Sequence, residues 1–551
     1  MPPWEIRERG SLDLRWFLAA VSMWVGVLAA SSEPFRTAVL VAALCCVLPL
    51  SAAAAWRRTM AGATYAATLG VCAAAIAAGM GVGAAHVLHR MADPVMTASA
   101  ASGTTATLRM RLDSPVQASS MRGAACKAQA TVLALHHDGV AEASGLPVLA
   151  MLPQEACSTL GQGATVMADA TVARSPYDAQ AVWVTVSDVH DREPAPWWWR
   201  TADWVRSRFF AVAARLDADS RILVPGVTLG VLGQDTVGAW ALDVDTERAD
   251  QLEEQCKRAG ILHLMAVSGG HYALLGPLVH ALGAWLRTPW RLTALWRLPL
   301  AGALTMVLVP SQSVTRAAIG ALLAMGFECC GRRPQTLHIL ALTVILALMQ
   351  DPGRATHVGF ALSCAAVAGI ALLAPSLTAV LGRMMPRGVA QALAVTIAAQ
   401  AFTLPIQMVM DPSIARWALP ANLLVGPCMD VATVFGLLAC ACAIASPELA
   451  ILPAQVSAWG TKGIAMVAGC FGADPSAGIP WVSGWAGILA IIAVELASGA
   501  SLWCLAQLVR AWRLLRGGED FRDTTPPTVR TARWIRDTIR TWDRLPWWHH
   551  G

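Results

Sequence analysis

Residues 357–381, HVGFALSCAAVAGIALLAPSLTAVL, contain no Asp, Glu, Lys or Arg. About 20 apolar residues are enough for a helix to span the hydrocarbon core of a bilayer, so this stretch predicts a transmembrane helix. The whole chain has a similar character, because 56% of its 551 residues are hydrophobic and only 14% are charged, against about 25% charged in soluble domains. We therefore expect a mainly α-helical, multi-spanning membrane protein, and a water-soluble globule is excluded.

Similar apolar blocks predict about twelve spans in the chain. They cover residues 14–32, 36–55, 62–88, 261–286, 295–309, 313–328, 336–350, 357–381, 388–410, 421–446, 449–472 and 481–510. Loops with several arginines alternate with loops that have few. The positive-inside rule then places the N-terminus and the C-terminus in the cytoplasm, as expected for a protein of the cell (inner) membrane.

Residues 93–192 have a different pattern. Short runs of β-favouring residues are separated by Gly, Pro, Ser and Asp, and they predict strands at 105–112, 126–135, 146–152, 164–173 and 181–188. Five strands in about 100 residues suit a small closed barrel of the OB type, with a β-sandwich as the alternative. Because the preceding span delivers the chain to the outside, we expect this domain to be extracytoplasmic.

Two of the fourteen cysteines, Cys126 and Cys157, fall in this β domain, whereas most of the others lie in apolar spans. An extracytoplasmic compartment permits disulfides, so we expect these two residues to be bonded to each other. The alternative is a pair of buried, unbonded cysteines in the β core.

The segment that follows the β domain predicts an amphipathic helix, with Trp198, Val205 and Phe209 on one stripe and Arg200 and Asp203 opposite. We expect it to lie on the outer membrane surface, and an ordinary packing helix is the alternative. The expected domains are therefore three N-terminal spans (1–92), the OB-like domain (93–192), the interfacial helix (193–218), a polytopic domain (219–516), and a cytoplasmic linker with a basic tail on the inner leaflet (517–551).

The densest polar cluster in an apolar context is residues 259–271, AGILHLMAVSGGH. Its Ser-Gly-Gly run predicts a helix break, and such a break is tolerated at membrane depth only where it is buried in protein or lines a wet cavity. We interpret the cluster as part of a substrate path, and hydrogen-bonded packing histidines are the alternative. The path residues expected here are His263, Ser268, Gly269, Gly270 and His271.

Further polar residues lie in or beside other apolar blocks, where a shared aqueous path would explain them. Those assigned to this path are Arg316, Asp351, Gln400 and Asn422. Arg316 can contact phosphate. For Lys462 and Glu495, a salt bridge or snorkelling near a helix end is an equally good interpretation.

Several enzyme classes lack their motifs in this sequence. There is no G-x-x-x-x-G-K-[ST] phosphate loop, no H-E-x-x-H, and no cysteine pair with zinc spacing outside a span. Ser268 beside His271 has neither a strand-to-helix elbow nor an evident acid partner. We therefore expect no enzyme activity, no metal and no cofactor, with an intramembrane hydrolase kept as an alternative.

The stretch HLMAVSGGH at 263–271 resembles the H-L-x-A-[IV]-S-G-x-H signature of the ComEC competence proteins. The resemblance continues, in the order of that family, through PSQSVTRA at 310–317, DP at 351–352, GFALS at 359–363, Q-x-x-T-x-P at 400–405 and N-L-L-x-x-P at 422–427. The layout of N-terminal spans, an OB-like domain and a polytopic domain is also similar. Gly270 departs from the family, which usually has a bulkier aliphatic residue there.

This resemblance implies an inner-membrane channel that passes single-stranded DNA into the cytoplasm during natural transformation. The implied partners are single-stranded DNA, membrane lipid, a separate extracytoplasmic DNA receptor and a cytoplasmic ATPase. A separate receptor is expected because Tyr177 and Trp183 are the only aromatic residues of the OB-like segment available for stacking on bases. The His-x-His-x-Asp-His motif of the metallo-β-lactamase-like domain found in many members is absent, so another protein would degrade the second strand. The alternative of a different class is a small-solute or proton-coupled transporter.

Overall fold

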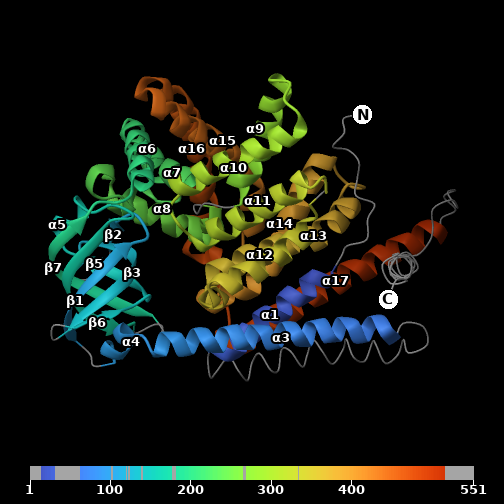
Figure 1. Cartoon of the computed structure of the whole chain (residues 1–551). Coiled ribbons are helices and arrows are strands. Elements are labelled where there is room, and N and C mark those ends of the chain that lie inside the picture. Colours follow the sequence, from blue (N-terminus) through green and yellow to red (C-terminus); the bar gives the residue numbers. More distant parts are fainter. Residues whose placement is uncertain are drawn as a thin grey trace.

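The computed structural model describes residues 14–31, 62–100, 103–119, 121, 124–137, 140–175, 181–264, 269–332 and 334–515. A β-barrel lies at one end of the molecule and helices form the rest (Figure 1). The predicted span at 36–55, the tail at 517–551, Ser268 and Tyr177 lie outside the described residues.

Every predicted span that falls on described residues contains a helix. The helices are α1 (Arg15–Ser31), α3 (Gly62–Met91), α9 (Gly270–Trp285), α10 (Trp290–Val307), α11 (Gln312–Cys329), α12 (Thr336–Gln350), α13 (Val358–Leu381), α14 (Arg387–Met410), α15 (Ala418–Ala445), α16 (Pro447–Gly472) and α17 (Gly484–Leu515). Within the described part of the chain, five segments are long and apolar enough to cross a bilayer: Thr68–Met91, Val358–Leu381, Arg387–Met410, Ala418–Ala445 and Gly484–Ser501. The count of about twelve spans stays a prediction.

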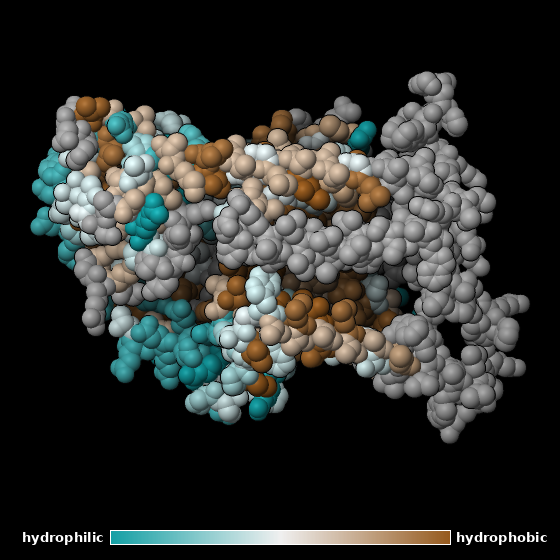
Figure 2. Space-filling view, turned by 90° about the horizontal axis from the view of Figure 1, so that it is seen from below, coloured by the Kyte–Doolittle hydropathy of each residue, from teal (hydrophilic) through white to brown (hydrophobic). Residues whose placement is uncertain are grey.

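The surface of the helical part is rich in large apolar side chains. Trp285, Leu452, Trp459 and Leu496 are each more than two-thirds exposed. Figure 2 shows hydrophobic residues gathered over the helices, whereas the barrel end is mostly hydrophilic. Soluble proteins rarely leave so extended an apolar surface in water. Together with the apolar helices, this surface identifies a membrane protein.

Five long strands form a closed barrel. They are β1 (Thr104–Leu112), β3 (Cys126–His137), β5 (Pro147–Leu152), β6 (Thr165–Arg174) and β7 (Val182–Glu193), joined by the short β2 (Gln117–Ala118) and β4 (Val140–Ala143). The pairing order is β1-β6-β7-β5-β3, and β3 pairs again with β1 to close the ring. Only β5 and β7 are parallel among these five strands. The prediction of a barrel is confirmed, and the sandwich alternative is wrong.

Small side chains fill the inside of this barrel. Along β6, alternate residues are buried, and they are Val166, Ala168, Ala170 and Val172. This period of two places one face of the strand in the core and the other face in solvent. The core strand β3 contributes Ala128 and Ala130 in the same way. So many alanines suit the narrow interior of a five-stranded barrel.

A disulfide joins the start of β3 to the short helix α5 (Gln154–Cys157). Cys126 and Cys157 are bonded, and their Cα atoms are 5.9 Å apart. Both residues belong to the barrel core. The bond therefore holds α5 against the barrel wall.

The barrel is attached to the helices at its N-terminal side through α4 (Pro94–Ala98). Asp93 precedes this short helix, and its carboxylate accepts a hydrogen bond from the backbone N–H of Val95 at 2.9 Å. The same carboxylate accepts a hydrogen bond from the Ser144 hydroxyl at 2.9 Å and one from the Gly145 N–H at 3.3 Å. Because Ser144 and Gly145 lie between β4 and β5, the end of α3 is fixed to the barrel.

The other attachment is α6 (Trp197–Ala213), the predicted amphipathic helix. Val205, Phe209 and Val212 of its apolar stripe are buried in one core cluster with residues of α15 and α16. The helix also contacts α10. The packing alternative therefore accounts for this stripe. A position on the membrane surface stays a prediction.

Arg206 connects α6 to both the barrel and α10. Its side chain is completely buried. Its guanidinium donates to the backbone carbonyls of Met306 at 2.6 Å and Val307 at 2.9 Å, and to the side chain of Gln162 between α5 and β6 at 2.8 Å. Asp203, one turn earlier, forms an ion pair with it at 2.8 Å. This one cation therefore ties three parts of the fold together.

Candidate site at the helix break

The predicted break lies between α8 (Thr246–Arg258) and α9. After α8, the chain forms a single 3-10 turn at Leu262–Leu264, and α9 begins only at Gly270. The predicted span at 261–286 is therefore correct for its second part but starts too early. Backbone N–H and C=O groups outside a helix need other hydrogen-bond partners. The contacts of this segment therefore show which groups remain available to bind a ligand.

Asn422 anchors the start of the break to α15. Its side-chain amide donates to the backbone carbonyl of Gly260 at 3.2 Å and to that of Ala418 at 2.7 Å. Gly260 has a φ of +73°, and a Cβ there would lie only 2.7 Å from the Cβ of Ala418, the first residue of α15. Glycine is thus required both by the backbone conformation and by the close approach of α15.

His271 anchors the end of the break to α7 (Ala218–Leu229). Its side chain is 1% exposed, and Nε2 lies 2.9 Å from the backbone carbonyl oxygen of Val227. A carbonyl can only accept, so Nε2 carries the proton in this contact. His263, in contrast, is exposed on the 3-10 turn. The two histidines therefore have different surroundings.

Arg316 lies against the break from α11. Its Nε donates to the Ser363 hydroxyl of α13 at 2.7 Å. A Cβ added to Gly269 would lie 2.7 Å from Nη2 of this guanidinium, so the arginine lies directly over the glycine backbone. Ser363 was not among the residues predicted for the site. The signal for it was its place as the polar residue of GFALS, within an otherwise apolar span.

The charge of Arg316 has no acidic partner in the part of the chain that the structure describes. No Asp or Glu oxygen lies within 4.0 Å of it there, although other arginines of the helices have one, such as Arg297 with Glu328. A guanidinium taken partly out of water is costly without a counter-ion. It offers several donors in a planar fork that matches the oxygens of a phosphate or a carboxylate. The chemistry available at the break is therefore anion binding.

Two residues assigned to the same path lie elsewhere. Asp351 precedes the 3-10 turn η5 (Pro352–Thr356), accepts from the Gly353 N–H at 3.0 Å and pairs with Arg354 at 3.5 Å. This turn packs on α1 and α3. Gln400 is in α14, and none of the contacts described for it or for Asp351 reaches Arg316. Lys462 pairs with Asp217 at 3.2 Å, as the salt-bridge interpretation predicted.

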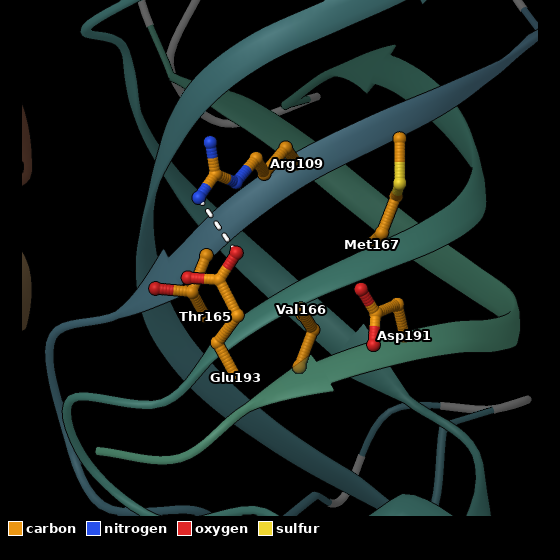
Figure 3. Close-up of a pocket in the computed structure, with 6 residues that line it drawn as sticks. All are labelled: Arg109, Thr165, Val166, Met167, Asp191 and Glu193. Carbon is orange, nitrogen blue, oxygen red and sulfur yellow. Dashed lines mark hydrogen bonds and ion pairs between the residues drawn. The ribbon is translucent and has the colours of Figure 1, made fainter.

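A separate pocket lies on the outside of the barrel (Figure 3). It is formed by β1, β6 and β7, and its lining residues are Arg109, Thr165, Val166, Met167, Asp191 and Glu193. Arg109 is paired with Glu193 at 2.7 Å, and Asp191 adds a further negative charge. The pocket therefore does not favour an anion. Among the described residues, no three His, Cys, Asp or Glu side chains gather so as to hold a metal ion.

Comparison with known proteins gives one family. Residues 245–505 match the family model described as "Competence protein". No curated protein and no solved structure matches the chain. The matched residues contain the break, Arg316, Ser363 and Asn422, whereas the barrel and α6 precede them. The similarity to the competence protein family therefore covers residues 245–505 of the chain.

Proposed function

We propose that this protein is the inner-membrane channel through which single-stranded DNA enters the cytoplasm during natural transformation. The similarity of residues 245–505 to the competence protein family suggests a role in DNA uptake. The observation that carries the channel proposal is Arg316, a partly buried cation at a helix break with no carboxylate partner among the described residues. A polymer with one phosphate per nucleotide supplies the missing negative charge.

The fixed backbone around the break supports this proposal. Asn422 holds the start of the break at Gly260, and His271 holds its end against α7. Ser363 orients the guanidinium through its Nε and leaves both terminal nitrogens for other contacts. A preorganised donor pair binds an oxyanion without paying to order itself first. In this proposal Gly269 keeps the backbone close, and the phosphate lies on the open side of the arginine.

The membrane arrangement follows from the charge pattern of the loops. We propose that the protein is multi-pass, with both termini in the cytoplasm and the barrel outside. We assign the barrel to the OB type from its five strands and closed order, and OB folds bind oligonucleotides. A separate receptor would deliver the DNA, and a cytoplasmic ATPase would draw the strand inward. The protein itself acts as a channel and not as an enzyme.

A transformation assay tests the channel. The variant Arg316→Gln removes the cation and keeps a polar side chain of similar length. We expect it to bind DNA at the cell surface and to lose internalisation by about 5- to 150-fold, because an unpaired phosphate contact costs on the order of 1–3 kcal/mol. Lys462→Gln is the matched control, because it removes a cation that already has a partner in Asp217.

Two results would contradict the proposal. One is wild-type transformation by Arg316→Gln at an equal protein level in the membrane. The other is an equal loss in Lys462→Gln, since any change of net charge would then explain the effect. Ser268→Ala separates the channel from the hydrolase alternative, because only a hydrolase that uses Ser268 would lose function.

A further inference from the structure

The exposed side of α6 carries a stripe of alternating tryptophans and arginines. Trp197, Arg200, Trp204 and Arg208 are spaced by three, four and four residues, which places them on one face of the helix. We call these four residues the tryptophan–arginine stripe. Trp197 and Trp204 are 67% and 47% exposed. The guanidinium of Arg208 lies over the Trp204 ring, 5.7 Å from its centroid.

Most of this stripe lies outside the packing face of the helix; only the half-exposed Arg208 also reaches α15, where its Nε donates to the backbone carbonyl of Ala443 at 3.1 Å. The core contacts of α6 come from Val205, Phe209 and Phe210. Its one acidic residue, Asp203, is turned toward the buried Arg206. The exposed face therefore presents indole rings and positive charge, with no carboxylate of α6 on it.

The chemistry of the stripe favours single-stranded nucleic acid over lipid. An interfacial helix normally inserts its apolar stripe into the bilayer, but in α6 that stripe is already used in the protein core. The face that remains alternates rings and cations. Single-stranded DNA alternates bases, which stack on aromatic rings, with phosphates, which pair with arginine.

The position of the stripe fits the same occupant. The helix follows directly from β7 of the barrel, and it lies beside α10 (Figure 1). Through Arg206 it contacts the end of α10, from which the chain continues into α11 and Arg316. A strand leaving the barrel for the helix break would thus have α6 next to it. The tryptophans also add stacking surface to that of Trp183 in β7.

We propose that the tryptophan–arginine stripe is a binding track for single-stranded DNA. Bases stack on Trp197 and Trp204, and phosphates pair with Arg200 and Arg208. This inference rests on the proposed function, because it assumes that the protein handles DNA. It adds a second contact region, outside the helix break, to that function.

Binding of a fluorescent oligothymidine of about 20 nucleotides to the full-length protein in lipid nanodiscs tests the track. We expect the double variant Trp197→Ala/Trp204→Ala to raise the Kd by about tenfold or more, since each lost stacking partner is costly. Trp197→Phe/Trp204→Phe keeps aromatic rings and should stay close to wild type. Arg200→Gln should lower the slope of log Kd against log salt by about one.

Trp285→Ala is the matched control, because Trp285 is 78% exposed on α9 and lies off the stripe. Its Kd should equal that of wild type. An unchanged Kd in Trp197→Ala/Trp204→Ala would overturn the proposal. A second result would also overturn it. Part of the tryptophan fluorescence of the wild type comes from the stripe and is missing in Trp197→Phe/Trp204→Phe. If brominated lipids quench this part, and saturating DNA does not relieve the quenching, the stripe is a membrane anchor.

The transformation assay keeps the two proposals apart. If Arg316→Gln abolishes uptake while the tryptophan variants bind DNA normally, the channel proposal stands and the track is refuted. If Arg316→Gln transforms normally while the tryptophan variants lose binding, the track stands and the proposed role of the helix break is refuted.

Discussion

Replacing Arg206 by methionine is expected to loosen the junction between the barrel and the helices. Methionine keeps much of the apolar volume but removes the charge and every donor. The carbonyls of Met306 and Val307, the amide of Gln162 and the carboxylate of Asp203 would each lose a hydrogen bond of 2.6–2.9 Å. The largest loss is at Asp203, whose side chain is only 24% exposed.

The expected loss of stability follows from the groups that lose their hydrogen-bond or ion-pair partner. Leaving one member of a buried ion pair without its partner costs about 3–5 kcal/mol, and each unsatisfied buried carbonyl adds on the order of 1 kcal/mol. Partial access of water to Asp203 reduces the first figure. We therefore expect the junction to lose about 4 kcal/mol, which raises the open population by several hundred-fold, at roughly 1.4 kcal/mol per factor of ten.

Limited proteolysis at the junction in detergent measures this opening, because cleavage tracks the population of the open form when closing is fast. Arg200→Met is the control on the same helix, since Arg200 is exposed, and its rate should match wild type. Equal cleavage rates for Arg206→Met and Arg200→Met would refute the reasoning. Arg206→Met/Asp203→Asn should recover part of the loss, because it removes the orphaned charge.

The pH dependence of the stability of Arg206→Met is a second test of the same reasoning. Burial raises the pKa of Asp203, and the charge of Arg206 only partly opposes this shift. Without the cation, the pKa of Asp203 rises further. A carboxyl whose folded pKa lies above its unfolded value favours folding when protonated, and that contribution is lost as pH rises through the folded pKa. The defect of Arg206→Met should therefore shrink as the pH is lowered.

Three further predictions concern the break and the barrel. Gly269→Ala adds a Cβ 2.7 Å from the overlying guanidinium, so DNA internalisation should fall several-fold at equal protein level, whereas Gly302→Ala, with open space around it, should transform normally. Cys126→Ser opens a disulfide with a sequence separation of 31 and should cost the barrel about 3–4 kcal/mol; free thiols at both positions of the wild type, by alkylation and mass spectrometry, would contradict the bond. The hydrogen bond from His190 to Asp169 raises the pKa of that histidine, so Asp169→Asn should lower it in an NMR titration, and the stabilisation by this pair should be lost as pH rises through the raised pKa.

The barrel was predictable because its strands alternate between core and solvent. The expected strand at 105–112 is Thr104–Leu112 in the structure, and the one at 164–173 is Thr165–Arg174. The last strand, however, continues to Glu193, five residues beyond the predicted end. Its final residues are mostly exposed, so no alternation of apolar side chains marks them. They are held by backbone pairing with β6, for which the sequence has no signature.

The site was predictable only in part. A polar residue in an apolar stretch indicates that its burial must be compensated, but it does not indicate which group compensates it. The Ser-Gly-Gly run predicted a helix break, and in the structure α9 begins at the last residue of this run, Gly270. The contact of His271 is the backbone carbonyl of Val227 in α7, more than forty residues away. Every residue has a backbone carbonyl, so the sequence does not indicate which one the histidine contacts. Asp351 was assigned to the same path as Arg316, but the structure places it immediately before η5, where it pairs with Arg354. The apolar stripe of α6 likewise has the same period whether it meets lipid or protein.

The attachment of α3 to the barrel has a mechanical consequence. The helix has 30 residues, which makes it about 45 Å long at 1.5 Å per residue. Its C-terminal end is joined through Asp93 to the loop between β4 and β5, so the two move as one rigid lever. A small rotation of the barrel becomes a displacement of several ångströms at the distant end of α3. A load applied to the barrel would in this way exert torque on the helices, and it would be felt at the distant end of α3.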